Sequence, residues 1–242
     1  MENKSVRLDK FLSHAGISSR RAIKKVLKEE NLTINGQRVT ESGIRVNPAI
    51  DKMLLNGKTI TEPAFVYFLL NKPIGYISTT ADEFARDNVV SLIDTPFRVY
   101  PVGRLDKDTH GLLILTNDGA LTHKVTHPRY HVPKVYRLLI NGKVSEQQIA
   151  TFKTGVLLSD GITLPAEVQP LSFKDNKTTL LVTLHEGRNR QIRRMCETLE
   201  MHLLDLERIA FGPIKLGKLE TGSYRALSKR EVEALRKAVE NS

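Results

Sequence analysis

The pattern of apolar and polar residues changes along the first sixty positions from a helical to a strand period. Residues 7–15 repeat apolar side chains at helical spacing, which predicts a helix that ends at Gly16. The apolar positions are Leu8, Phe11, Leu12 and Ala15. A second helix follows, for which Ser18 and Ser19 are candidate N-caps. Its apolar stripe consists of Ala22, Ile23, Val26 and Leu27.

Two short segments with strand spacing follow these helices. Residues 32–39 and 54–60 each contain an Asn-Gly pair between alternating residues, at Asn35-Gly36 and Asn56-Gly57. Asn-Gly supplies the two positive-φ residues of a tight hairpin turn. The N-terminal part is therefore predicted to consist of two small helices followed by β-hairpins.

Strands and helices mix in the rest of the chain, after a short linker at 61–63. Strand patterns occur at 66–70, 112–116, 134–140 and 178–184, and helical patterns at 189–201 and about 228–240. The helix at 189–201 has Ile192, Met195, Cys196 and Leu199 on its apolar face. Because the elements do not alternate as regular βαβ units, we expect an α+β fold. The predicted domains are residues 1–62 and 63–242.

Positive charge is concentrated in the first of these domains. The net charge is +10, and residues 1–60 hold 12 Lys and Arg against 6 Asp and Glu, whereas the remainder holds 25 against 21. Dense positive charge favours a polyanion such as RNA, because each neutralised phosphate releases condensed counterions. A solvated surface without a partner is the alternative. The cations expected to contact RNA from the second helix are Arg20, Arg21, Lys24, Lys25 and Lys28.

Several other classes of site and partner lack support. The chain contains neither a dinucleotide-binding nor a P-loop glycine motif, so we expect no nucleotide cofactor. Cys196 is the only cysteine, which excludes an internal disulfide and a cysteine-based zinc cluster. His123, His127 and His131 have the spacing of a metal ladder, but Pro128 interrupts the helix that would align them. We expect no metal, no membrane partner and a cytoplasmic protein, since no signal peptide or spanning apolar run is visible.

The segment GRLDKDTHGLLILTNDG, residues 103–119, places Asp106 between Arg104 and Lys107, just before the apolar run at 112–115. Alone, such a residue would be interpreted as a turn Asp that caps its own backbone. However, the buried strand would hold one end of the loop still, and a neighbouring Arg would keep the carboxylate ionised. An ionised, oriented Asp can act as a nucleophile without a metal or cofactor.

Further features of this segment bear on its chemistry. Gly103 and Gly111 would permit close approach of a large ligand. Asp106 and Asp108 could be imagined as a hydrolytic carboxylate pair, but positions two apart on an extended chain are about 7 Å apart, which is too loose to identify one.

The same segment resembles the signature of the ribosomal-RNA pseudouridine synthases of the Rsu/Rlu group. Four further stretches agree in the order of that family, namely LNKPIGYIST, PKVYRLLI, EGRNRQIRRMCE and RIAFGPIKLGKL. Residues 5–62 resemble the RNA-binding domain named after ribosomal protein S4. The resemblance covers essentially the whole chain. It implies a mixed, mainly antiparallel sheet flanked by helices in the catalytic domain, no cofactor, and ribosomal RNA as substrate.

The resemblance also implies roles for single residues. Asp106 would be the carboxylate needed to cleave the glycosidic bond of uridine, either by attacking the anomeric carbon or by removing a ribose proton. Tyr136 would lie against the uracil ring and help to release the proton of carbon 5, and Arg188 would pair with Asp106. Arg104 is a candidate for insertion where the flipped base has left the RNA stack. The cations left to contact phosphates are Arg190, Arg193 and Arg194.

Alternatives stay open at this point. Tyr136 could be an ordinary tyrosine at the edge of the core, and Arg188 one more cation on a phosphate. The pair Asn189-Arg190 favours the large-subunit enzymes, since the small-subunit type usually has Tyr-His there. A non-catalytic RNA-binding factor of ribosome assembly is the competing function. We expect a monomer.

Overall fold

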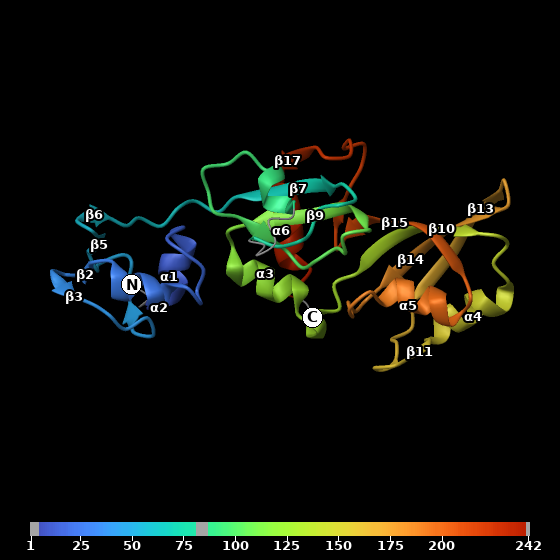
Figure 1. Ribbon diagram of the computed structural model, residues 1–242, viewed down its shortest axis with the longest axis horizontal. Helices are drawn as coiled ribbons and strands as arrows, with labels where there is room; N and C mark the ends of the chain where they lie inside the picture. Colours follow the sequence, from blue (N-terminus) through green and yellow to red (C-terminus); the bar gives the residue numbers. More distant parts are fainter. Residues whose placement is uncertain (1–4, 81–86, 241–242) are drawn as a thin grey trace. The chain divides into compact units, whose positions relative to one another are not determined.

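The computed structural model describes residues 5–80 and 87–240 (Figure 1). Residues 1–4, part of the N-terminal stretch used to judge a signal peptide, lie outside the described residues. The chain divides into two compact units. Unit 1 spans residues 1–66 with 95–98, and unit 2 spans 67–94 with 99–242. Each unit combines helices with antiparallel strands, so the expected α+β class is confirmed.

Unit 1 contains two helices and a four-stranded sheet of order β3-β2-β5-β6. Its helices are α1 (Leu8–His14) and α2 (Ile23–Glu29), and its strands are β1 (Val6–Arg7), β2 (Leu32–Ile34), β3 (Gln37–Arg38), β4 (Arg45–Val46), β5 (Met53–Leu55) and β6 (Lys58–Thr59). Both predicted hairpins are confirmed. Asn35 and Gly36 have φ values of 51° and 83°, and Asn56 and Gly57 have 49° and 81°.

The start of α2 differs from the sequence prediction. The hydroxyl of Ser19 accepts a hydrogen bond from the backbone N–H of Ala22 at 3.2 Å, so it caps a turn that precedes the helix. The helix proper begins at Ile23, without a side-chain cap. The basic residues predicted on this segment are all exposed, although the guanidinium of Arg20 also donates to the buried carboxylate of Asp9 at 3.0 Å.

Unit 2 is built on a nine-stranded sheet. Its main order is β13-β14-β10-β15-β9-β7-β17, with β16 beside β15 and β8 beside β9. The strands are β7 (Tyr67–Lys72), β8 (Tyr100–Pro101), β9 (His110–Thr116), β10 (Lys134–Asn141), β13 (Glu167–Lys174), β14 (Lys177–Leu184), β15 (His202–Phe211), β16 (Ile214–Lys215) and β17 (Tyr224–Ala226). Among these pairs only β9–β15 is parallel, so the expected mainly antiparallel sheet is confirmed.

Helices pack on this sheet over two separate cores. The α-helices are α3 (Gly119–Thr126), α4 (Glu146–Thr154), α5 (Gln191–Thr198) and α6 (Lys229–Lys237). Short 3-10 turns occur at Val89–Leu92 and Pro128–Tyr130, and β11 (Leu157–Leu158) with β12 (Gly161–Ile162) forms a small hairpin. No helix within 5–80 and 87–240 has the length and apolar character needed to span a bilayer.

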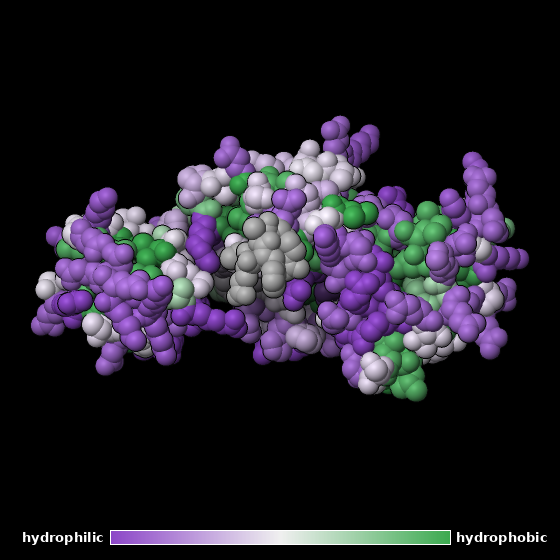
Figure 2. Space-filling view, viewed as in Figure 1, coloured by the Kyte–Doolittle hydropathy of each residue, from purple (hydrophilic) through white to green (hydrophobic). Residues whose placement is uncertain are grey.

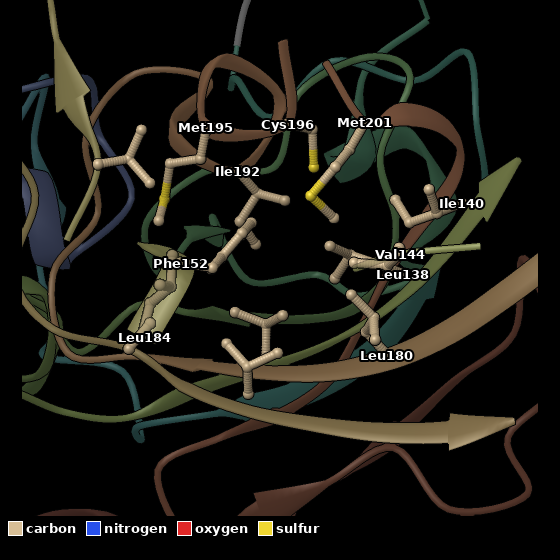
Figure 3. Close-up of a cluster of buried hydrophobic side chains, with 14 of the residues drawn as sticks. Leu138, Ile140, Val144, Phe152, Leu180, Leu184, Ile192, Met195, Cys196 and Met201 are labelled. Atoms are coloured by element: carbon tan, nitrogen blue, oxygen red, sulfur yellow. The ribbon is translucent and has the colours of Figure 1, made fainter. Parts of the chain in front are cut away.

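The first core lies between α4, α5 and the strands β10 and β14. In Figure 3, Ile192, Met195 and Cys196 of α5 face Phe152 of α4 and Leu138 of β10. Burial raises the pKa of the Cys196 thiol to about 12. Because Ile192, Met195 and Cys196 are buried in this core, the apolar face predicted for α5 is confirmed.

The second core lies between β7, β9, α3 and α6. Leu112 and Ile114 of β9 pack in one buried cluster with Leu121 of α3 and Leu235 of α6. Gly111, just before this buried run, has a φ of 101°, and a Cβ there would overlap the backbone of Arg208 on β15. The sequence analysis assigned Gly111 to ligand approach, and this was wrong: its missing side chain lets two strands approach.

Candidate active site

A cavity of about 380 Å³ lies in unit 2 at the ends of β10 and β15. Its walls come from the loop at 103–109, which we name the Asp106 loop, from β10 and β15, and from residues 186–193 before and within α5. The surface between α3 and α5 is predominantly hydrophilic in Figure 2. A cavity of this size falls in the range of ligand pockets.

The Asp106 loop joins β8 to β9. Leu105 is buried, and its backbone N–H and C=O both bond to the hydroxyl of Ser78, at 3.0 and 2.8 Å. The backbone N–H of Thr109 donates to the carbonyl of Asp106 at 3.1 Å. The Asp106 side chain is half-buried and lines the cavity, as the sequence analysis expected of a fixed loop before a buried strand.

Lys72 of β7 holds the Asp106 loop in place. The sequence predicted no role for this residue. Its side chain is fully buried at 0% exposure. The ammonium donates to the carbonyls of Thr109 and Pro73 at 2.8 and 3.0 Å, and to that of Lys107 at 3.5 Å. Burial lowers the pKa of Lys72 to about 8, against the opposing effect of Asp108 and Asp106.

Arg193 fixes the same loop from α5. Its guanidinium donates to the carbonyl of Asp108 at 2.8 Å and to the hydroxyl of Thr109 at 3.2 Å. It also lies 3.3 Å from the Asp108 carboxylate, which Arg190 reaches at the same distance. Partial burial disfavours the charged form of Asp108, but Arg193 and Arg190 outweigh it and hold the pKa of Asp108 below its usual value.

Arg188 has different partners from those expected. It lines the cavity, but its guanidinium donates to Glu186 at 3.0 Å and to the carbonyls of Gly161 and Ile162 at 2.9 and 2.6 Å. Among the contacts of the described residues, none joins Arg188 to Asp106. The structure therefore differs from the expected pairing, because nearer acceptors occupy this guanidinium.

The three arginines expected to contact phosphates differ in exposure and in their partners. Arg190 is exposed, but the side chains of Arg193 and Arg194 are only 15% and 24% exposed. Arg194 forms an ion pair with Asp160 at 3.0 Å. Arg193 and Arg194 thus face acidic partners within the fold rather than open solvent.

Tyr136 lies on the face of β10 that strand alternation predicts. Leu138 and Ile140, on the same face of β10, are fully buried, whereas Tyr136 is half-buried and lines the cavity. Its cross-strand partner is Arg208 on β15. Arg104 lies exposed at the rim.

Lys134, Arg208 and Phe211 also line the cavity, and the sequence predicted no role for them. Lys134 and Phe211 are cross-strand partners. Lys134 and Arg208 both lie over the Phe211 ring, at 5.7 and 5.3 Å from its centroid. Burial, together with Arg208, lowers the pKa of Lys134 to about 8, against the opposing effect of Glu186.

The cavity is strongly cationic. Its lining includes two carboxylates, Asp106 and Glu186. Its cations are Arg104, Lys134, Arg188, Arg190, Arg193 and Arg208. An ionisable Asp among guanidinium groups and an aromatic ring suits an anionic, flipped nucleotide. Within the described parts of the chain, no group of three or more His, Cys, Asp or Glu could hold a metal ion.

Comparison with known proteins agrees with this geometry. Residues 66–198 match the RNA pseudouridylate synthase family, and residues 6–49 match the S4 domain. The chain is 40% identical over 233 residues to the ribosomal large subunit pseudouridine synthase B of Bacillus subtilis, covering 95% of each protein. It is 37% identical to the dual-specificity RNA pseudouridine synthase RluF of Escherichia coli, covering 100% of this chain and 82% of that one.

A solved structure shows the same likeness. A crystal structure of a pseudouridylate synthase has a TM-score of 0.69 and 31% identity, and the match covers 95% of this chain and 99% of the other. An RNA pseudouridine synthase of Aquifex aeolicus is 42% identical over 236 residues. A chain with this fold, this acidic loop in a cationic cavity and these relatives belongs to the RNA pseudouridylate synthase family, as a pseudouridine synthase with an S4 domain.

Proposed function

We propose that this pseudouridine synthase isomerises uridine in ribosomal RNA, with Asp106 as the essential carboxylate. The position of Asp106 in the cationic cavity beside Tyr136 is the observation that supports this role most. A relative named for the ribosomal large subunit supports the substrate class. In this proposal residues 1–62 form the RNA-binding domain and residues 63–242 the catalytic domain.

The reaction begins when the target nucleotide leaves the RNA stack and enters the cavity. Flipping costs a few kcal/mol, and stacking on an aromatic ring offsets about 1–3 kcal/mol of it. Tyr136 supplies that ring and lies near the proton of carbon 5 that must leave. Arg104 at the rim fills the gap in the RNA stack. The isomerisation is redox-neutral and consumes no water.

Asp106 acts on the ribose of the flipped nucleotide. As the bond to N1 breaks, its carboxylate either bonds to the anomeric carbon or takes a ribose proton. When carbon 5 of the uracil bonds to the anomeric carbon, the carboxylate is displaced or returns that proton. Carbon 5 then loses its own proton, and N1 takes one up. Lys72 and Arg193 hold the Asp106 loop by its backbone and by Asp108. We assign Arg193 the loop-orienting role that the family resemblance gave to Arg188, because its contacts reach this loop. Arg188 is retained as a residue of the cavity wall.

The remaining cations bind RNA at the cavity wall and beyond it. Arg190 contacts phosphates beside the catalytic centre, with Arg193 and Arg194 contributing only where their ion pairs leave them accessible. The exposed basic residues of the second helix contact the same RNA from unit 1. These residues are Arg20, Arg21, Lys24, Lys25 and Lys28.

The relative named for the ribosomal large subunit and the pair Asn189-Arg190 support the assignment of the ribosomal subunit. We infer that the substrate is large-subunit RNA, with small-subunit RNA as the alternative, and that the protein acts as a cytoplasmic monomer. Mapping pseudouridines in both ribosomal RNAs from cells with and without this protein tests the subunit. Loss of a pseudouridine from the small-subunit RNA alone would contradict the large-subunit assignment.

Release of tritium tests the catalytic role of Asp106. Ribosomal RNA labelled at carbon 5 of uridine should release tritium with the wild type and retain it with Asp106→Asn, because the amide cannot supply the negative charge. Asp175→Asn, on an exposed turn after β13, is the matched control and should retain activity. If the wild type binds this RNA without releasing tritium, the non-catalytic RNA-binding function replaces the proposal.

A further inference from the structure

One end of the cavity holds one buried and one half-buried cation that the roles above leave unused. Arg208 is 3% exposed, and its Nε donates to the carbonyl of Leu112 at 2.8 Å. One terminal nitrogen, NH2, of the same guanidinium is buried and has no hydrogen-bond partner among the described residues. A buried donor left unpaired costs about 1–3 kcal/mol, so its retention needs an explanation.

Lys134 is the second cation, next to Arg208 over the ring of Phe211. Its ammonium donates to the carbonyl of Val132 at 2.7 Å. That bond leaves two of its three donors available. The desolvation that lowers its pKa to about 8 is the cost of holding an ammonium in this place.

No carboxylate in the cavity wall neutralises this pair. The acid whose charge opposes the lowering of the Lys134 pKa is Glu186. Its carboxylate already accepts hydrogen bonds from Arg188 at 3.0 Å, from Gln191 at 2.7 Å and from the backbone N–H of Leu164 at 3.0 Å. Two desolvated cations without a dedicated counter-charge form a preorganised site for an anion.

The reaction generates an anion in this cavity. When the bond between the anomeric carbon and N1 breaks, its electron pair moves onto the uracil, whose negative charge spreads over N1, O2 and O4. The ribose compensates for the lost electron pair in one of two ways. It forms a new bond to Asp106, or it loses a proton to Asp106. By both routes the detached uracil carries one negative charge until carbon 5 bonds to the ribose, when Asp106 is displaced or returns the ribose proton. Carbon 5 then loses its proton, and N1 gains one.

We propose that Lys134 and Arg208 are catalytic residues that stabilise the anionic, detached uracil. The assignment rests on the proposed function, since it requires that the base enter this cavity. Cross-strand pairing sets both cations beside the tyrosine expected to contact the ring: Tyr136 opposes Arg208, and Lys134 lies two residues before Tyr136 on the same face of β10. The guanidinium of Arg208 and the free donors of Lys134 supply positive charge to the uracil oxygens as their negative charge develops.

A better leaving group should depend less on this stabilisation. Fluorine at carbon 5 makes the uracil ring more acidic, so the detached base holds its charge more easily. In single-turnover reactions at saturating RNA, Lys134→Met should slow glycosidic cleavage at the mapped uridine by about 10²-fold. The same variant should slow cleavage at 5-fluorouridine in that position by a clearly smaller factor. Loss of the original nucleoside after digestion measures both, because the fluorinated product has no carbon-5 proton to release.

Further variants separate this role from a structural one. Arg208→Lys, which keeps the charge but loses the free guanidinium nitrogen, should show the same differential loss. Lys134→Arg should recover part of the rate, and Lys143→Met, an exposed lysine just after β10, should match the wild type for both substrates. Thermal unfolding of each variant reports whether the fold is retained.

Equal slowing of uridine and 5-fluorouridine cleavage, or slowing that saturating RNA removes, would overturn the inference and indicate a phosphate contact or a packing role. A wild type that cleaves neither nucleoside would refute the proposed function itself.

Discussion

Replacement of Lys72 by Met should change how the stability of the protein responds to alkaline pH. The unfolded chain holds its lysine protons up to the ordinary pKa of 10.5, whereas the folded protein releases the Lys72 proton near 8. Between these values the unfolded state binds more protons, so the Lys72 contribution to stability grows as pH rises. The difference in pKa corresponds to about 3 kcal/mol, since each tenfold step in affinity is worth about 1.4 kcal/mol.

Urea unfolding of the full chain, followed by circular dichroism at pH 7 and pH 10, measures this contribution. The free energy of unfolding of the wild type should rise, relative to that of Lys72→Met, by about 2–3 kcal/mol between the two pH values. Lys134 titrates in the same range but is present in both proteins, so its effect cancels in the comparison. Lys215→Met, an exposed lysine of β16, should follow the wild type. An identical pH response of Lys72→Met and wild type would refute the reasoning that this ammonium is desolvated in the folded state.

Two further predictions concern the RNA surface and the Asp106 loop. The double variant Lys24→Glu, Lys28→Glu should bind RNA more weakly and with a smaller salt dependence, because phosphate contacts are lost. Unchanged affinity at low salt would show that this helix does not touch RNA. Arg193→Gln should lower the single-turnover rate about 10²-fold by releasing the Asp106 loop, whereas Arg188→Gln should lower it less. A larger loss of rate with Arg188→Gln than with Arg193→Gln would return the orienting role to Arg188.

Local backbone chemistry explains which elements could be predicted. Asn35-Gly36 and Asn56-Gly57 adopt positive φ at low cost, so the turn type follows from the residues themselves. The apolar face of α5 follows from the helical repeat in the same way. The start of α2 could not be predicted from Ser19 alone, because this hydroxyl bonds to an N–H in the turn before the helix.

Long-range partners explain what the sequence analysis missed in the site. Arg193 turns toward Asp108 and Thr109, which lie more than 80 residues away along the chain. Arg188 turns toward Gly161 and Ile162 of another hairpin. No local pattern indicates which of several arginines in one basic run meets which acceptor.

Three cations that face the interior of unit 2 were not predicted, for a related reason. The residues concerned are Lys72, Lys134 and Arg208, which all lie on strands. Strand alternation predicts which residues share a face of the sheet, but a face that carries a charged residue is ordinarily assigned to solvent. Lys72 and Arg208 are buried here and Lys134 is half-buried, because fixed carbonyl oxygens or an aromatic ring lie within their reach. Those acceptors are defined only by the folded sheet.

The burial of Cys196 makes the chain convenient for spectroscopy. A thiol that is 1% exposed, with a pKa of about 12, stays protonated and unreactive toward maleimides at neutral pH. A cysteine introduced on an exposed loop would therefore be labelled selectively without first removing the natural one. Fluorophores attached in this way could report distances between the enzyme and its RNA during turnover.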